Sequence, residues 1–355
     1  MNSLMAHWAK TRPFAGMNLL VGTPVFRNTF LQYKALMMGG AKLWIGRDTV
    51  LCDFKIVEML KGWGFPVLDA SQALEQERLQ AFDLVLDCAG QFARLSPRFG
   101  FVELTRSGVQ FYQDSPKPVY VADSGIVKRI ETSLGTGEGY VRAMKELGFK
   151  DFKEKPCVVF GSGKVGSGIV LQLLREGACV QVVTDTSFGA NPFLDANGVP
   201  VTDCNDVAAV VSLVNHADYV VTATGVKGAL DVPELAAALM ESRAVLANMG
   251  VEDEYGPKVP AERVLAEKHS LNFVLEEPTH LKYIDASLAL HAALGEQLVC
   301  EAAAGAGAIA NQNVSWSGTR NPPEELEREI LSVTLQDGLI GPEVCEMLGG
   351  LPGDN

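Results

Sequence analysis

The sequence predicts an α/β protein built from two doubly wound parallel-sheet domains. From Asn18 onward, short apolar segments with strand character alternate with helical segments, which is the pattern of a parallel sheet. Residues 156–186 repeat this pattern around a glycine-rich turn, which predicts that the second domain is a Rossmann domain. A chain of 355 residues is too long for one ordinary hydrophobic core, and its 47% hydrophobic residues supply enough apolar surface for two domain cores.

The first domain is expected to hold its own parallel sheet. Its predicted strands are short and apolar, and they cover 19–22, 42–46, 66–69, 84–87 and, as the last strand, 118–123. Helices are expected between these strands near 26–38 and 52–61. The N-terminal segment around His7 carries no comparable pattern, and we expect it to be frayed.

A long helix over 125–148 is expected to lead into the second domain, although three glycines interrupt its periodicity. A strongly apolar helix over 284–304 then returns the chain to the first domain, and the tail after Pro322 is predicted to be helical. The expected division is therefore a substrate domain formed by 1–124 plus 285–355 and a dinucleotide-binding domain formed by 125–284.

The glycine-rich turn contains each part of a dinucleotide-binding site in the required order. A buried strand ends at Phe160, and a helix with an apolar face follows the turn. In a G-x-G-x-x-G turn the first glycine allows a tight bend, the second admits a pyrophosphate, and the third lets helix and strand pack closely. The helix N-terminus then offers free N–H groups and the positive end of its dipole. The predicted cofactor-binding residues here are Gly161, Ser162, Gly163, Lys164, Val165 and Gly166.

The next predicted strand ends at Thr184 and Asp185, and Asp185 lies 24 residues after Gly161. An acidic residue at this position suits the two free hydroxyls of the NAD ribose. A 2′-phosphate would require a nearby cation, yet residues 184–191 contain no Arg or Lys. We therefore expect NAD, with NADP less favoured.

Composition excludes several classes of partner. A formal net charge of −13 argues against nucleic acid or an anionic membrane surface, because both require a basic face. The seven cysteines are scattered without a C-x-x-C pair, and no secretion signal or apolar run of membrane-spanning length occurs. No His, Cys or carboxylate cluster has metal-ligand spacing. We expect a cytoplasmic homo-oligomer that binds a small-molecule substrate and no metal.

Several motifs resemble S-adenosylhomocysteine hydrolases and their relatives. The resemblance extends from about residue 12 to about residue 304 and includes the run ADSGIVKRIETSLGTGEGYVRAM at 122–144. It implies a related NAD fold in which two further turns, TATG at 222–225 and NMG at 248–250, line the cofactor. The residues that it adds to the cofactor site are Thr222, Thr224, Gly225, Asn248 and Gly250.

The substrate side departs from that family. A His-Met-Thr run that meets the substrate is replaced by Thr23, Pro24 and Val25. The family's catalytic lysine aligns with Val127, one place from Lys128, and its aspartate aligns with Glu131. Of the family's acidic segment this sequence keeps Asp87. Of its Glu-Glu-Thr-Thr-Thr-Gly segment it keeps Glu103, Thr105 and Ser107. We expect Asp87 and Glu103 to contact substrate, and Thr105 and Ser107 to contact cofactor.

Proton chemistry requires a group whose pKa lies near the working pH, which favours histidine or a partly buried lysine. Lys128, beside Asp123 and Glu131, is the first candidate, and His291 on an apolar helix is the second. For Lys128 a solvated surface residue is the open alternative, and for His291 it is a packed core histidine. Arg27 and Arg106 follow predicted strand ends, where they would anchor an acidic substrate or form ordinary surface ion pairs.

Three functions remain open from the sequence. The first is an NAD-dependent oxidoreductase that acts on a small polar hydroxy or amino compound, with the nicotinamide directed to a cleft lined by Arg106, Asp123, Lys128 and His291. The second keeps the hydrolase or lyase chemistry of the resembling family, in which oxidation is transient. The third is a non-catalytic NAD-binding regulatory protein.

Overall fold

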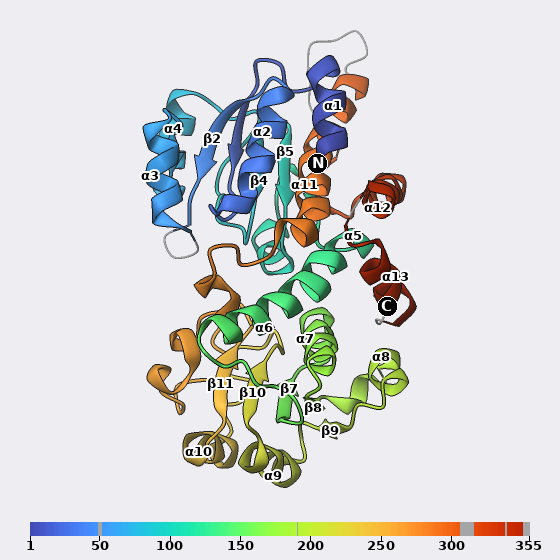
Figure 1. Cartoon of the computed structure of the whole chain (residues 1–355). Helices are drawn as coiled ribbons and strands as arrows, with labels where there is room; N and C mark the ends of the chain where they lie inside the picture. Colours follow the sequence, from blue (N-terminus) through green and yellow to red (C-terminus); the bar gives the residue numbers. More distant parts are fainter. Residues whose placement is uncertain (49–51, 190, 306–315, 338, 351–355) are drawn as a thin grey trace. The chain divides into compact units, whose positions relative to one another are not determined.

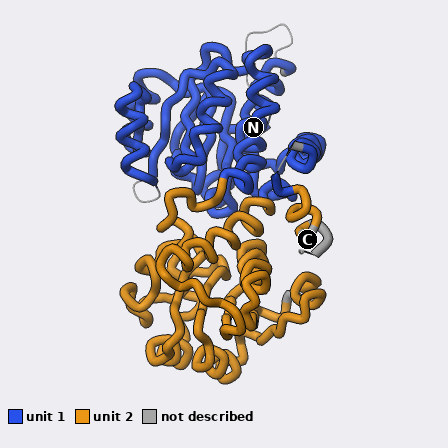
Figure 2. Tube along the Cα trace, viewed as in Figure 1, with its two compact units in different colours: residues 1–128, 281–340 blue, residues 129–280, 341–355 orange. Residues whose placement is uncertain are grey.

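The structure, a computed structural model, describes residues 1–48, 52–189, 191–305, 316–337 and 339–350. The chain forms two compact units, one of Met1–Lys128 with Leu281–Ile340 and one of Arg129–His280 with Gly341–Asn355 (Figure 2). Each unit contains one parallel sheet, which confirms the predicted α/β class with two parallel-sheet domains. The chain passes between the units after Lys128 and again after His280, and helix α13 (Gly341–Gly350) groups with the second unit.

The sheet of the first unit has seven strands in the order β12-β6-β5-β4-β1-β2-β3, and all of its pairings are parallel. The strands are β1 (Asn18–Val21), β2 (Lys42–Gly46), β3 (Val67–Leu68), β4 (Leu84–Asp87), β5 (Gly100–Glu103), β6 (Pro118–Val121) and β12 (Gly318–Arg320). The expectation that β6 would be the last strand was wrong, because β12 pairs with it. Strand β12 is short, and neither Thr319 nor Arg320 is buried, so no apolar pattern marks it.

Helices cover both faces of this sheet (Figure 1). They are α2 (Phe30–Met38), α3 (Phe54–Gly62), α4 (Ala70–Leu79) and α11 (Leu281–Gly305); α1 (Asn2–Thr11) packs on α2, and α12 (Glu324–Asp337) packs on α11. The expectation that the N-terminal segment would be frayed was wrong, because this segment forms the ordered helix α1. Its Trp8 is fully buried, and the indole N–H donates to Glu296 of α11 at 2.6 Å. A single buried tryptophan does not produce the apolar periodicity by which a helix is predicted from sequence. Within the described ranges, no helix combines the length and apolarity needed to cross a membrane.

The second unit is built on a five-stranded parallel sheet in the order β11-β10-β7-β8-β9. Its strands are β7 (Pro156–Phe160), β8 (Cys179–Thr184), β9 (Val201–Asp203), β10 (Tyr219–Thr222) and β11 (Val245–Asn248). Numbered from β7, this is the 5-4-1-2-3 order of a Rossmann domain, and the strand order reverses between β7 and β10. Ligands of such sheets bind at the carboxyl ends of the strands beside this reversal.

The helix expected over 125–148 consists of three pieces. They are α5 (Ile126–Arg129), a π-helical segment η3 (Ile130–Gly135) and α6 (Thr136–Glu146). Helix α6 crosses α7 (Lys164–Arg175) so closely that a Cβ on Gly137 would lie 2.3 Å from the carbonyl oxygen of Gly168. A glycine that interrupts the apolar periodicity thus permits the helices to touch. The remaining helices of this sheet are α8 (Pro192–Ala196), α9 (Val207–His216) and α10 (Pro233–Glu241).

Candidate functional site

The glycine turn lies between β7 and α7, and its three glycines have different surroundings. Gly161 has a φ of +101°, and a Cβ there would lie 2.4 Å from the carbonyl oxygen of Ala223. A Cβ on Gly166 would lie 2.1 Å from the carbonyl oxygen of Gly161. A Cβ on Gly163 would meet no atom within 4 Å. The protein itself therefore requires Gly161 and Gly166, whereas Gly163 borders open space that a ligand can enter.

The first turn of α7 offers backbone donors to that space. Gly163 is the N-cap residue, and it has no side chain that could cap the first amides of the helix. Ser162, Lys164 and Val165 are half-buried around it. The N–H groups of a helix N-terminus and the positive end of the helix dipole favour a phosphate at this position. The residues at the turn therefore fit the pyrophosphate of a dinucleotide.

Acidic side chains lie at the ends of β8, which is next to β7, and of β9, which is next to β8. Asp185 follows β8, and its Oδ1 accepts from the amide of Ser187 at 2.9 Å. Asp203 ends β9 and is the register partner of Thr184, and it accepts from the hydroxyl of Thr186. That hydrogen bond lowers the pKa of Asp203, which keeps its negative charge. Thr184 bonds the hydroxyl of Ser162 at 3.0 Å, which ties this strand end to the glycine turn.

Asn191 is a contributor to this region that the sequence did not reveal. Its Nδ2 donates to the carbonyl oxygen of Ser162 at 2.9 Å, and its Oδ1 accepts from the amide of Phe193 at 3.0 Å. It thus caps α8 and fastens that helix to the glycine turn. An Asn followed by Pro192 is a helix-start signal that would have located α8.

The turns after β10 and β11 are bound by buried side chains. Asn248 is fully buried, and its Oδ1 accepts from the hydroxyl of Thr222 and the amide of Gly250, both at 2.9 Å. Its Nδ2 donates to the carbonyl oxygen of Glu252 at 2.8 Å. The amides of Thr224 and Gly225 donate to Glu254, a residue that no sequence pattern had pointed to. Asn248 therefore fixes the turn after β11, at the carboxyl end of the sheet, by bonding the backbone of Gly250 and Glu252.

In the first unit, Asp87 and Glu103 are fully buried register partners at the carboxyl ends of β4 and β5. Asp87 accepts from the amides of Cys88 at 2.8 Å and Phe92 at 2.9 Å, and from the hydroxyl of Tyr112. Tyr112 is a further participant that the sequence did not identify. Two carboxylates side by side without an intervening cation are unfavourable unless one holds a proton.

Glu103 accepts hydrogen bonds from the two turns next to it, the one at 89–90 and the one at 105. It accepts from the amides of Ala89 at 2.9 Å, Gly90 at 3.0 Å and Thr105 at 2.7 Å, and from the hydroxyl of Thr105 at 2.6 Å. Ser107 donates its hydroxyl to Thr105 at 3.2 Å. The structure therefore brings together four predicted site residues of this unit, and the hydrogen bonds of the two carboxylates hold loop 88–92 and the turn at 105.

The protonation of this pair is shifted. Burial, with the charge of Glu103 as a second cause, raises the pKa of Asp87 to about 8. Burial also raises the pKa of Glu103, and burial and the nearby Asp87 raise that of Tyr112. Below pH 8 the pair can therefore hold one proton that an exposed aspartate would have released.

His291 is fully buried on α11, and both of its ring nitrogens are engaged. Nε2 lies 2.9 Å from the carbonyl oxygen of Val102, which can only accept, so Nε2 carries the hydrogen. Nδ1 then accepts from the amide of Gln32 at 3.1 Å, and Gln32 accepts from the hydroxyl of Thr23 at 3.1 Å. Burial lowers the pKa of His291 to about 4. These contacts favour the packed histidine over the general base.

The other candidates are distributed between the units. Asp123 and Lys128 are buried in the first unit, whereas Glu131 is half-buried in η3 of the second. Arg27 and Arg106 begin the short helices η1 (Arg27–Thr29) and η2 (Arg106–Tyr112), and both side chains are exposed.

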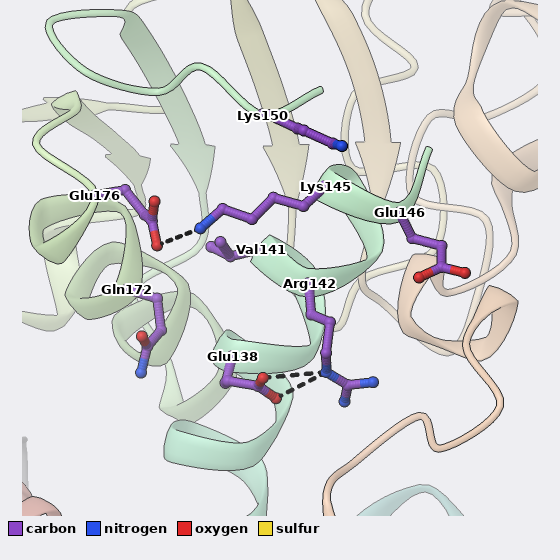
Figure 3. A pocket seen from close by; sticks show the side chains of 8 residues that line it. All are labelled: Glu138, Val141, Arg142, Lys145, Glu146, Lys150, Gln172 and Glu176. Carbon is purple, nitrogen blue, oxygen red and sulfur yellow. Dashed lines mark hydrogen bonds and ion pairs between the residues drawn. The ribbon is translucent and has the colours of Figure 1, made fainter. Parts of the chain in front are cut away.

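A groove of about 540 Å³ lies on α6 and α7, and it contains none of the predicted site residues (Figure 3). Four of its charged groups form two pairs, Arg142 with Glu138 at 3.1 Å and Lys145 with Glu176 at 2.7 Å. Glu176 lies at the C-terminal end of α7, whereas the glycine turn lies at its N-terminal end. The groove is therefore separate from the dinucleotide turn.

Comparison with known families agrees with the geometry of the second unit. Residues 149–254 match a family model described as "Putative NAD(P)-binding". The second sheet is therefore an NAD(P)-binding Rossmann-type domain. The match leaves open whether the cofactor is NAD or NADP. A search of the curated proteins gave no match.

Solved structures are similar to this chain at low sequence identity. The first of two dipicolinate synthase chains, from Bacillus halodurans, has a TM-score of 0.52 at 14% identity, covering 81% of this chain and 99% of its own. The second, from Bacillus subtilis, has a TM-score of 0.42 at 12% identity, covering 82% and 98%. Pyruvate reductase of Chlamydomonas reinhardtii has a TM-score of 0.42 at 11% identity, covering 81% and 98%. The similarity to the Bacillus halodurans chain shows a shared fold and no more.

Proposed function

We propose that this chain is an NAD-dependent oxidoreductase that acts on a small polar hydroxy or amino compound. The observation that carries the proposal is the glycine turn, where the only one of the three glycines with open space around it, Gly163, caps the helix whose N-terminus faces that space. Bound there, NAD would supply a hydride acceptor to a substrate carbinol or amine. The protein would have to hold the substrate and take up its proton.

The acidic strand ends support NAD over NADP. The carboxylates of Asp185 and Asp203 follow adjacent strands on the side where the adenosine ribose would lie. A 2′-phosphate would be repelled by these charges, whereas a ribose diol can donate hydrogen bonds to Asp185. Since no Arg or Lys occurs in 184–191, that segment supplies no compensating cation.

On the substrate side, the proposal assigns one residue to proton transfer and two to substrate anchoring. Lys128 is the proposed proton-transfer residue, because it is a buried lysine, 2% exposed, one place from the position of the resembling family's catalytic lysine. Exposed Arg27 and Arg106 are the proposed anchors for an acidic group of the substrate. Because the resembling family's His-Met-Thr run is replaced by Thr23, Pro24 and Val25, and its lysine by Val127, S-adenosylhomocysteine hydrolysis should be undetectable or very slow.

One observation favours a second candidate, a non-catalytic NAD-binding protein. His291 has both ring nitrogens bound, and Asp87 and Glu103 accept from several backbone amides. Three groups that could have performed proton chemistry are thereby committed to the fold of the first unit. A protein that binds NAD as a signal would require none of them to be available.

A single set of assays on the full chain separates these functions. Small molecules released from the purified protein are identified by mass spectrometry, and NADH absorbance is followed with a panel of 2-hydroxy and 2-amino acids. Net NADH formation would support the oxidoreductase. Release of homocysteine from S-adenosylhomocysteine without net NADH would indicate the hydrolase. Tight NAD binding without turnover of any compound would support the non-catalytic protein, and absence of NAD or NADP binding would refute all three.

A further inference from the structure

Glu254 is a buried carboxylate that lies beside the dinucleotide turn and that no motif marks. Its side chain is fully buried in the second unit. Its Oε2 accepts from the amide of Thr224 at 2.8 Å and its Oε1 from the amide of Gly225 at 2.7 Å. Two successive amides that converge on one anion form a backbone nest, and here the anion is supplied by the protein itself.

The segment that carries Glu254 is itself held firmly. The carbonyl oxygen of Glu254 accepts from the amide of Leu230 at 2.9 Å, and Asp253 pairs with Lys268 at 2.9 Å. A Cβ on Gly250 would lie 2.1 Å from Oε1 of Glu254, so the turn after β11 has closed against the carboxylate. Glu254 therefore has little freedom to withdraw from the nest.

The turn that Glu254 binds is in contact with the first glycine of the dinucleotide turn. The amide of Ala223 donates to the carbonyl oxygen of Phe160 at 2.8 Å. A Cβ on Gly161 would lie 2.4 Å from the carbonyl oxygen of Ala223 and 3.0 Å from Cα of Thr224. A displacement of residues 223–225 would therefore change the space beside Gly161, where the backbone bends toward α7.

We propose that Glu254 is a positioning residue of the dinucleotide site, whose carboxylate fixes the 223–225 turn against Gly161 so that the glycine turn can receive a pyrophosphate. The inference rests on the proposed dinucleotide binding and adds a residue to it. Charge-assisted hydrogen bonds to two amides are stronger than neutral ones, and an amide side chain cannot reproduce both. Glu254 would thus act on affinity without touching the cofactor.

The test compares three variants of the full chain by NAD⁺ calorimetry, thermal unfolding and amide hydrogen exchange. In Glu254→Gln one acceptor remains, but an NH₂ group faces the second amide, so NAD⁺ affinity should fall about 10-fold or more. Exchange at Thr224 and Gly225 should accelerate. Glu252→Gln is the matched control, because the Glu252 side chain is 60% exposed on the same loop, and it should behave as wild type.

A rescue experiment distinguishes positioning from general stability. Glu254→Ala leaves an empty nest that formate can enter, so formate should restore NAD⁺ affinity and slow the exchange of the two amides, with no effect on wild type. Wild-type affinity in Glu254→Gln would overturn the inference. A loss that merely follows the fall in unfolding temperature, with no effect of formate on Glu254→Ala, would overturn it as well. If wild type binds neither NAD⁺ nor NADP⁺, the proposed function fails, which the wild-type titration reports separately.

Discussion

Replacing Asp87 by Asn should remove a pH dependence of stability from the first unit. Asn keeps the shape of the side chain but cannot ionise, and its one carbonyl oxygen can accept from only one of the two amides, that of Cys88 at Oδ1 or that of Phe92 at Oδ2. In the folded protein the pKa of Asp87 is raised to about 8 by burial, with Glu103 as a second cause, from an ordinary value of 3.8. The folded state therefore keeps a proton that the unfolded state has released across this range.

The sign and size follow from proton linkage. A pKa raised on folding contributes stability that is fully present below the unfolded value and is lost as pH rises through the folded value. Each pH unit in that range changes the free energy of unfolding by about 1.4 kcal/mol. From pH 6.5 to 8 wild type should therefore lose about 1.5 kcal/mol relative to Asp87→Asn, because the slope flattens near the folded pKa.

The window avoids a second titration with the opposite sign. The pKa of His291 is lowered by burial from 6.5 to about 4, so its contribution to stability is lost as pH falls below 6.5. Urea unfolding followed by tryptophan fluorescence reports the first unit alone, since the four tryptophans lie within it: Trp8, Trp44, Trp63 and Trp316. The exposed Asp114→Asn is the control. Parallel stability profiles for wild type and Asp87→Asn would refute the reasoning.

Three further predictions concern single side chains. Gly166→Ala should destabilise the second unit by about 2 kcal/mol or more, since its Cβ would lie 2.1 Å from a backbone oxygen, and a wild-type unfolding temperature would contradict that contact. Asp185→Ala should weaken NAD⁺ binding and narrow its advantage over NADP⁺; tighter binding of NADPH than NADH by wild type would refute the cofactor choice. His291→Ala should cost roughly 2–4 kcal/mol, because it leaves a cavity and an unpaired carbonyl oxygen of Val102, and a loss below the error of urea titration would show that these contacts are not needed.

The glycine turn could be predicted from sequence because local geometry dictates its residue types. Gly161 sits at a positive φ against Ala223, and Gly166 touches Gly161, so each position excludes a side chain. Most of the apolar strands were equally predictable, since buried parallel strands read as continuous apolar runs, although none of the predicted strand ranges covered the buried strand β5. Strand β12 was not, because its three residues bury no apolar side chain.

The roles of individual polar residues depend on contacts that no spacing reveals. Asp87 was placed at the end of a predicted strand, which is β4, but the amides that surround Asp87 and Glu103 belong to loops whose paths are set by tertiary packing. Glu254 lies in the segment Val251–Gly256 beside Glu252 and Asp253, and nothing in the sequence distinguishes the buried carboxylate from its exposed neighbour. Such residues become apparent only once the backbone is placed.

The measurement that tests dinucleotide binding most directly is calorimetric titration of NAD⁺ into wild type and Gly163→Val, with unfolding temperatures recorded for both. Because a Cβ at Gly163 meets no protein atom within 4 Å and the residue has a φ of −69°, valine should fit without disturbing the fold. It would fill the space that the pyrophosphate needs. We predict an unfolding temperature within about 2 °C of wild type and a loss of NAD⁺ affinity of about 100-fold or more. Equal NAD⁺ affinity in the two proteins would contradict the assignment of this turn to a dinucleotide.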